Sequence, residues 1–153
     1  MKKMVLSLMM TCNIWCVAIA QSKDTDVKLN HIGMYVTDLA VSTTFYETIL
    51  HLKQIPEPFH DGKHTWFSIG AAGHLHLIQG EKKSYERDRN DHLCFSVQNI
   101  DAIIANLDKN HVEYTNWPGT AKEPTVRVDG VKQIYFKDPD GHLIEINNDR
   151  SVK

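Results

Sequence analysis

Four side chains of this sequence have the types and the spacing of a metal-ligand set. They are three histidines, His31, His76 and His92, and one carboxylate, Glu145. Imidazole is a ligand for zinc, nickel and iron, and a carboxylate adds a hard anionic ligand that also suits manganese. On an octahedral ion, four such ligands leave two positions for water or for a chelating substrate. The residues therefore predict a divalent ion (Zn, Ni, Mn or Fe), with Glu145 also placed to act as a base in proton transfer.

The first pair of these residues lies in an internal repeat. A shift of 61 residues places segment 31–39 over segment 92–100. Apolar residues occupy every second position of both segments, which is typical of a half-buried strand. These residues are Ile32, Met34 and Val36 in the first copy, and Leu93, Phe95 and Val97 in the second. The opposite face of each strand then carries a histidine, His31 or His92.

A helix is expected after each of these strands. Asp38 and Asn99 precede the two apolar-periodic segments, and Asx side chains accept hydrogen bonds from the free N–H groups that open a helix. We expect helices at 39–50 and 100–107. Short extended segments are predicted to follow, at 52–55 and 112–114.

Each half ends in a predicted hairpin whose last strand holds the second pair of candidate ligands. Trp66 precedes His76 by ten residues, and Tyr135 precedes Glu145 by the same ten. Trp66 and Tyr135 are therefore predicted to be equivalent residues of the two halves. The second hairpin contains the sequence Asp-Pro-Asp-Gly at 138–141, which strongly favours a turn.

The predicted order of elements is thus β-α-β-β-β, twice. The two repeat units cover about 28–80 and 89–148, and a charged segment that we interpret as a solvated connector joins them. Neither unit buries its own apolar face alone, so the two units should pack together. The expected fold class is α+β, with two βαβββ repeats forming a cupped mixed sheet.

The remaining histidines and the cysteine are given lesser roles. His74 shares a strand face with His76 and is either a group supporting the metal ligands or an alternative ligand. His142, beside the turn, is interpreted as a surface residue, and Cys94 as a small buried thiol. Four further histidines fall in polar surroundings and are interpreted as solvated: His51, His60, His64 and His111.

Residues 1–20 have the pattern of a signal peptide. Lys2 and Lys3 precede an uncharged, mostly apolar segment that ends in Ala18-Ile19-Ala20. We expect cleavage before Gln21, a single mature domain at 21–153 without stable membrane insertion, and export to a periplasm or to the outside. A retained membrane anchor is the alternative, although the apolar segment is short for a span.

Charge narrows the choice of partners. The formal net charge is −2 and becomes more negative once Lys2 and Lys3 are removed, which argues against a nucleic-acid partner. After cleavage Cys94 is the one cysteine left, so no disulfide forms within the mature chain. We expect a small-molecule substrate, and the residues leave a homodimer open.

A family resemblance covers about 28–148, and its most specific segments are 29–32, 37–39, 45–46, 90–97 and 133–146. Through them the chain resembles the vicinal-oxygen-chelate superfamily, which includes glyoxalase I, fosfomycin-resistance thiol transferases, extradiol dioxygenases and bleomycin-binding proteins. The resemblance implies that His31, His92 and Glu145 are metal ligands. It also matches Tyr135 to a substrate-side tyrosine of the thiol transferases. His76 departs from typical glyoxalase I, which has a glutamate there.

The resemblance implies a metal-dependent lyase or isomerase that chelates two neighbouring oxygens of a substrate and stabilises an enediolate, with Glu145 moving the proton. The alternatives are a thiol transferase acting on an epoxide such as fosfomycin, a non-enzymatic binder of small molecules, and a ring-cleaving dioxygenase. The metal set counts against the binder, and the chain length counts against the dioxygenase.

Overall fold

The two βαβββ repeats are confirmed in the computed structural model, which describes residues 27–80 and 88–151. Residues 1–20, with the predicted signal peptide, lie outside the described residues. The first half consists of β1 (His31–Val36), α1 (Leu39–Ile49), β2 (Lys53–Ile55), β3 (His64–Ser68), a short 3-10 turn (Gly70–Ala72) and β4 (His74–Gln79). The second consists of β5 (Leu93–Ser96), α2 (Ile100–Lys109), β6 (Tyr114–Thr115), β7 (Thr125–Val126), β8 (Lys132–Lys137) and β9 (Leu143–Asn147).

Each half forms its own mixed sheet. The strand order is β1-β4-β3-β2 in the first sheet and β5-β9-β8-β6 in the second, with β7 paired to β8. The pairs β1–β4 and β5–β9 are parallel, and the other pairs are antiparallel. The first strand of each repeat is therefore an edge strand, which leaves a row of backbone N–H and C=O groups without a strand partner among the described residues.

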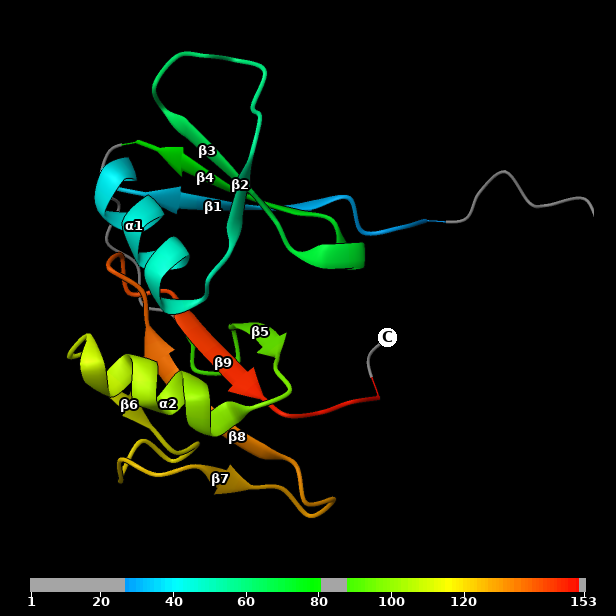
Figure 1. The fold of residues 1–153 in the computed structure, drawn as a ribbon, viewed down its shortest axis with the longest axis vertical. Helices are drawn as coiled ribbons and strands as arrows, with labels where there is room; N and C mark the ends of the chain where they lie inside the picture. Colours follow the sequence, from blue (N-terminus) through cyan, green and yellow to red (C-terminus); the bar gives the residue numbers. More distant parts are fainter. Residues whose placement is uncertain (1–26, 81–87, 152–153) are drawn as a thin grey trace, which may run out of the picture.

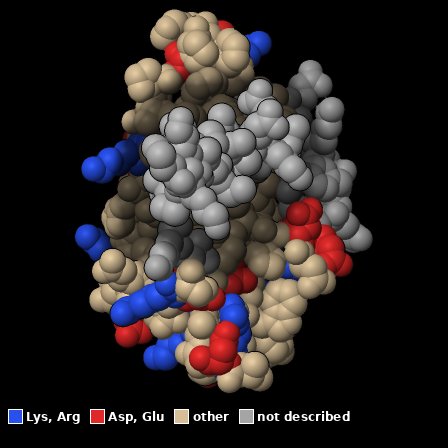
Figure 2. Space-filling view, turned by 90° about the vertical axis from the view of Figure 1, so that its right-hand side faces the viewer, with Lys and Arg blue, Asp and Glu red and all other residues tan. Residues whose placement is uncertain are grey.

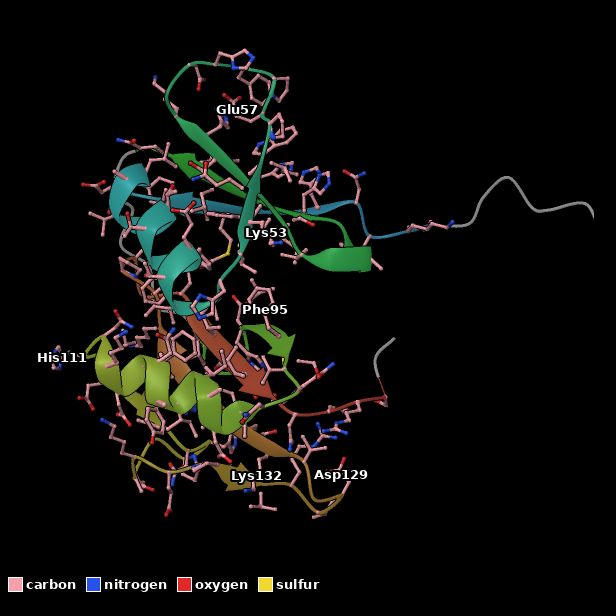
Figure 3. All side chains as sticks on the ribbon, viewed as in Figure 1. Lys53, Glu57, Phe95, His111, Asp129 and Lys132 are labelled. Carbon is pink, nitrogen blue, oxygen red and sulfur yellow. The ribbon has the colours of Figure 1, made fainter. Side chains whose placement is uncertain are left out.

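Both helices begin as predicted. The Asp38 side chain accepts a hydrogen bond from Val41 N at 3.0 Å, and Asn99 accepts one from Ala102 N at 3.1 Å. Both helices end differently from the usual glycine pattern. His51 and His111 follow the two C-caps with φ values of 53° and 56°, a region that glycine normally occupies. His111 projects from the end of α2 in Figure 3.

A single apolar core joins the two halves. Its buried residues come from both sheets and both helices. In Figure 1 the halves are stacked along the long axis, with α1 between the first sheet and the second half. Phe45 of α1 packs 6.2 Å from Phe136 of β8, centroid to centroid, and the Asn106 side chain of α2 donates to the Thr48 and Ile49 carbonyls. The sheet faces with the candidate ligands therefore point away from this core.

The acidic turn between β8 and β9 also connects the halves. One Asp140 oxygen accepts hydrogen bonds from Thr37 N at 2.9 Å and Thr37 Oγ1 at 2.6 Å, and the other accepts from Ser42 Oγ at 2.9 Å. Asp138 accepts from Tyr46 Oη at 3.0 Å and from His142 Nδ1 at 2.7 Å. The turn that orients β9 is thus bonded to the β1–α1 junction and to α1 itself.

The surface carries charges of both signs. On the face shown in Figure 2, basic and acidic side chains are intermixed and not gathered by sign. Within residues 27–80 and 88–151, no helix has the length and apolar character that crossing a membrane requires.

The acidic turn gives the first prediction. Asp140→Asn should lower the free energy of unfolding by about 2 kcal/mol, because it weakens three hydrogen bonds to a carboxylate. Urea denaturation at neutral pH measures this. Asp101→Asn, at an exposed position in the first turn of α2, is the control and should change the free energy by at most about 0.5 kcal/mol.

The same variant has an expected pH dependence. Burial raises the pKa of Asp140, but hydrogen bonds from Thr37 and Ser42 outweigh it and bring the pKa below the ordinary 3.8. Because the folded-state pKa is lowered, the stabilisation is complete above the ordinary value and is lost as the pH falls through the lowered one. A difference between wild type and Asp140→Asn that persisted unchanged in strong acid would contradict this assignment.

Candidate metal centre

The two hairpins place equivalent residues in the same register. Trp66 of β3 lies directly across from His76 of β4, and Tyr135 of β8 lies directly across from Glu145 of β9. The predicted equivalence of Trp66 and Tyr135 is therefore confirmed. In both halves an aromatic side chain stands beside a candidate ligand on the face turned away from the core.

In the first half, three rings form a stack. The His31 and His76 rings are 4.3 Å apart at an angle of 9°, and Trp66 lies on the other side of His76 at 3.9 Å and 2°. His76 is only 8% exposed, and its Nε2 has no hydrogen-bond partner among the described residues. His31 at the outer end of the stack is exposed, and its Nδ1 lies 2.8 Å from Asn30 Oδ1.

The surroundings keep His76 neutral. Burial lowers its pKa, and the neighbouring imidazoles of His31, His74 and His64 lower it further. The neutral ring is the form that binds metal ions. A buried, unpartnered nitrogen on a neutral imidazole therefore fits the role of a metal ligand.

In the second half, His92 faces Glu145. His92 Nδ1 lies 3.1 Å from the Arg89 carbonyl oxygen, and since a carbonyl only accepts, Nδ1 carries the hydrogen. This leaves Nε2 facing Glu145 Oε2 at 3.0 Å. Two electron-rich atoms at this distance need a cation between or beside them, either a proton or a metal ion. Two ligands about 2.1 Å from one ion and at right angles to each other have about this separation.

A buried hydrogen-bond network holds the Glu145 carboxylate. Tyr135 Oη donates to Oε2 at 2.7 Å, and Asn147 Nδ2 donates to Oε1 at 3.0 Å. Gln133 Nε2 donates to Tyr135 Oη at 2.6 Å, which directs the phenol proton toward Glu145. Burial raises the pKa of Glu145, but the hydrogen bonds led by that from Tyr135 outweigh it and lower the pKa. Burial, followed by Glu145, raises the pKa of Tyr135, so the phenol stays a donor.

Arg89 adds a cation that the sequence analysis missed. It lies at the end of the connector that we interpreted as solvated, yet it is half-buried. Its guanidinium lies 5.3 Å from the Trp117 ring centre and 5.0 Å from that of Tyr135. It also donates to Thr115 Oγ1 and to the Asn116 carbonyl. A basic residue three positions before His92 was the available signal, but a charged run alone did not separate it from its solvated neighbours.

The four predicted ligands form two pairs in one chain. Among the described residues, no group of three or more His, Cys, Asp or Glu side chains is placed to hold a metal ion. The two pairs lie apart because the halves meet through the helices and the acidic turn, while the edge strands β1 and β5 belong to separate sheets. The convergence of all four residues on one ion, and metal binding by them, stay predictions.

Two other histidines differ from expectation. His142 is not a surface residue but is 6% exposed and paired with Asp138. His64 is not fully solvated: it lines a cavity of the first half, with its Nδ1 2.9 Å from Asp61 Oδ1. His74 lines the same cavity.

Cys94 is exposed as a residue, not buried as expected. Its sulfur nevertheless accepts a hydrogen bond from Asn147 Nδ2 at 3.2 Å. Burial of the thiol, followed by the Glu145 carboxylate, raises the pKa of Cys94 to about 12. Cys94 is therefore protonated at neutral pH, which excludes it as a reactive thiolate there.

Comparisons with known proteins agree with this architecture. YaeR of Escherichia coli, described as uncharacterized, is 30% identical over 130 residues that cover 78% of this chain and 94% of YaeR. Metallothiol transferase FosB of Staphylococcus epidermidis is 30% identical over 125 residues, covering 78% of this chain and 80% of FosB. The solved structure of oxidase ChaP-H1 is 26% identical, with a TM-score of 0.67 and coverage of 84% of this chain and all (100%) of that one.

A family profile gives the assignment. It matches residues 28–146, which include both repeats and all four candidate ligands. The α+β fold of paired βαβββ units, described above, is the fold of the structures that this chain resembles. The chain belongs to the Glyoxalase/Bleomycin resistance protein/Dioxygenase superfamily, the vicinal-oxygen-chelate proteins.

Proposed function

We propose that this protein is a metal-dependent enzyme of the glyoxalase type, a lyase or isomerase acting on a small molecule with two neighbouring oxygens. The observation that carries the proposal is the contact between His92 Nε2 and Glu145 Oε2 at 3.0 Å. The ring nitrogen has its hydrogen on the far side, so this close approach calls for a cation. His31 and His76 complete the proposed ligand set with two further imidazoles.

We infer that two chains together complete the centre. Each chain presents one pair of candidate ligands on each sheet, and the edge strands β1 and β5 each have one outer edge without a strand partner among the described residues. A symmetric dimer that brings β1 of one chain beside β5 of the other would unite His31 and His76 with His92 and Glu145 twice over. Two equivalent sites per dimer would result.

The residues of the chain divide the chemistry between them. A divalent ion held there would supply a Lewis acid that polarises neighbouring substrate oxygens. Glu145 is the acceptor for a proton on the adjacent carbon, since its lowered pKa keeps it ionised at neutral pH. Tyr135 donates to that carboxylate and holds it in one orientation. Because His76 replaces a second carboxylate, Glu145 both removes and returns the proton.

A thiol transferase of the fosfomycin-resistance type is the second candidate. FosB of Staphylococcus epidermidis is a relative at 30% identity, and Tyr135 lies beside the proposed metal ligand Glu145. The two activities separate in one assay. Loss of fosfomycin that requires both an added thiol and metal would favour the transferase, and conversion of methylglyoxal hemithioacetals would favour the lyase.

Glu145 and His76 give the next prediction. Glu145→Gln should lose at least about a hundredfold in turnover and much less in bound metal, because an amide oxygen coordinates weakly but accepts no proton. His76→Glu should retain both metal and turnover, since it restores a pair of carboxylates. Elemental analysis beside turnover measures both quantities. Glu113→Gln, at an exposed position, is the control. Equal metal content and equal activity in all variants would rule out Glu145 as the base.

The shared centre is tested by mixing two inactive variants. His31→Ala and His92→Ala chains, refolded together, should regain metal in about one quarter of the sites, because half of the dimers are mixed and each holds one intact site. Each variant refolded alone should bind none. Light scattering confirms dimers in all three samples. If dimers form and the mixture regains no metal, the centre is not shared between chains.

Export remains a proposal drawn from residues 1–20. Protein recovered outside the cytoplasm should begin at Gln21 in N-terminal sequencing, because the charged start, the apolar segment and Ala18-Ile19-Ala20 occur in the order that a signal peptidase requires. An intact Met1 on that protein would show that no cleavage occurs.

A further inference from the structure

A second feature of the first half is a cavity that the ligand pair does not fill. Its volume is about 510 Å³, within the range of about 300 to 1,000 Å³ of small-molecule sites. We call it the ring pocket, and it is lined by Asn30, His31, Phe59, His64, Trp66, His74, His76 and Ile78. We propose that the ring pocket binds the planar conjugated ring of a substrate that carries a carboxylate. The proposal rests on the proposed function, because His31 and His76 border the same cavity.

Aromatic rings form one wall of the ring pocket. The Phe59 ring lies 4.6 Å from that of His64 and meets Trp66 edge-on at 6.1 Å. Phe59 is 58% exposed and Ile78 is 40% exposed, so the wall includes apolar surface that faces solvent. Offset and edge-on ring pairs are more favourable than the burial of the same area alone. A flat, conjugated ligand therefore gains more from this wall than a saturated ligand of equal size.

The loop between β2 and β3 holds the wall in place without a ligand. Glu57, labelled in this loop in Figure 3, accepts hydrogen bonds from Phe59 N at 2.6 Å and His60 N at 2.8 Å. Asp61 accepts from Lys63 N at 2.9 Å and lies 2.9 Å from His64 Nδ1. The two carboxylates thus fix the backbone at Phe59 and the ring of His64, which reduces the ordering that binding requires.

The polar groups of the ring pocket favour a ligand that accepts hydrogen bonds. Its lining contains imidazoles, an indole and an amide, and no carboxylate. The Trp66 indole N–H is buried and has no hydrogen-bond partner among the described residues, which is unfavourable unless a ligand supplies an acceptor. A carboxylate oxygen on the ring supplies that acceptor.

The second half has a different residue at the position equivalent to Trp66. Tyr135, in the register position of Trp66, uses its hydroxyl to hold Glu145. The ring would therefore lie on the first-half side of the centre, and the proton transfer would occur on the second-half side. A second copy of this chain packing on Phe59 and Ile78 is the competing occupant, and the experiment separates the two.

The experiment compares two probes on the metal-free, chelator-treated protein by isothermal titration calorimetry. Salicylate is planar, and 2-hydroxycyclohexanecarboxylate is its saturated counterpart with the same polar groups. Salicylate should bind about tenfold more tightly. Phe59→Leu keeps apolar volume without the ring and should remove most of this preference. Val41→Ala, at an exposed apolar position on α1 outside the ring pocket, should leave it unchanged.

Three outcomes overturn the proposal: equal affinity for the two probes, no binding of salicylate, or a ring preference that Phe59→Leu leaves intact. A fourth does so as well, namely that Phe59→Leu dissociates the dimer in sedimentation while salicylate affinity is unchanged, since the occupant is then a second chain. The metal content of the untreated protein is measured in parallel. If the untreated protein contains metal but the probes bind equally, the ring-pocket proposal alone is contradicted. If salicylate is preferred but the untreated protein contains no metal, the proposed function alone is contradicted.

Discussion

The hydrogen bonds of the acidic turn between β8 and β9 are the constraint on which the rest of the structure depends. Asp140 accepts hydrogen bonds from Thr37 and Ser42, and Asp138 accepts one from Tyr46. One turn of the second half therefore holds the β1–α1 segment of the first half in place. The same turn leads directly into β9. The position of Glu145 relative to the first half is therefore determined at this turn, before any metal or substrate is considered.

This packing decides where the chemistry can take place. Since the helices and the acidic turn face inward and form one core, the sheet faces with the imidazoles and the carboxylate face outward. Each half then offers two of the proposed ligands, and in the described part of the chain no group of three or more such side chains is placed to hold a metal ion. The unpaired edges of β1 and β5 and the incomplete ligand pairs are two consequences of the same arrangement. In the dimer that we propose, one partner chain would cover the strand edges and complete the ligand pairs.

The strands, the helix starts and the equivalent hairpins were predictable, because each depends on local chemistry. Alternating apolar residues indicated β1 and β5, and Asp38 and Asn99 indicated where the helices begin. The matched spacing of Trp66 and Tyr135 indicated their equivalence. Long-range contacts were not predictable: repeat symmetry assigns His31 and His92 to equivalent strands but does not say which strand edges meet. The burial of His142 and the contacts of Arg89 also depend on distant segments, and the left-handed backbone of His51 is one that few histidines adopt.

The hairpins of the two halves have the same strand register, but the side chains at equivalent positions differ in their chemistry. This difference comes from single residues. At one position Trp66 lies flat on His76, while at its equivalent Tyr135 reaches the carboxylate through a hydroxyl. A flat ring without a hydroxyl shields a neutral imidazole and extends an aromatic wall. A phenol with a buried partner fixes a charged oxygen in one orientation. The two βαβββ units thus provide matched positions, and in the function that we propose the different residues at those positions separate ring binding from proton transfer.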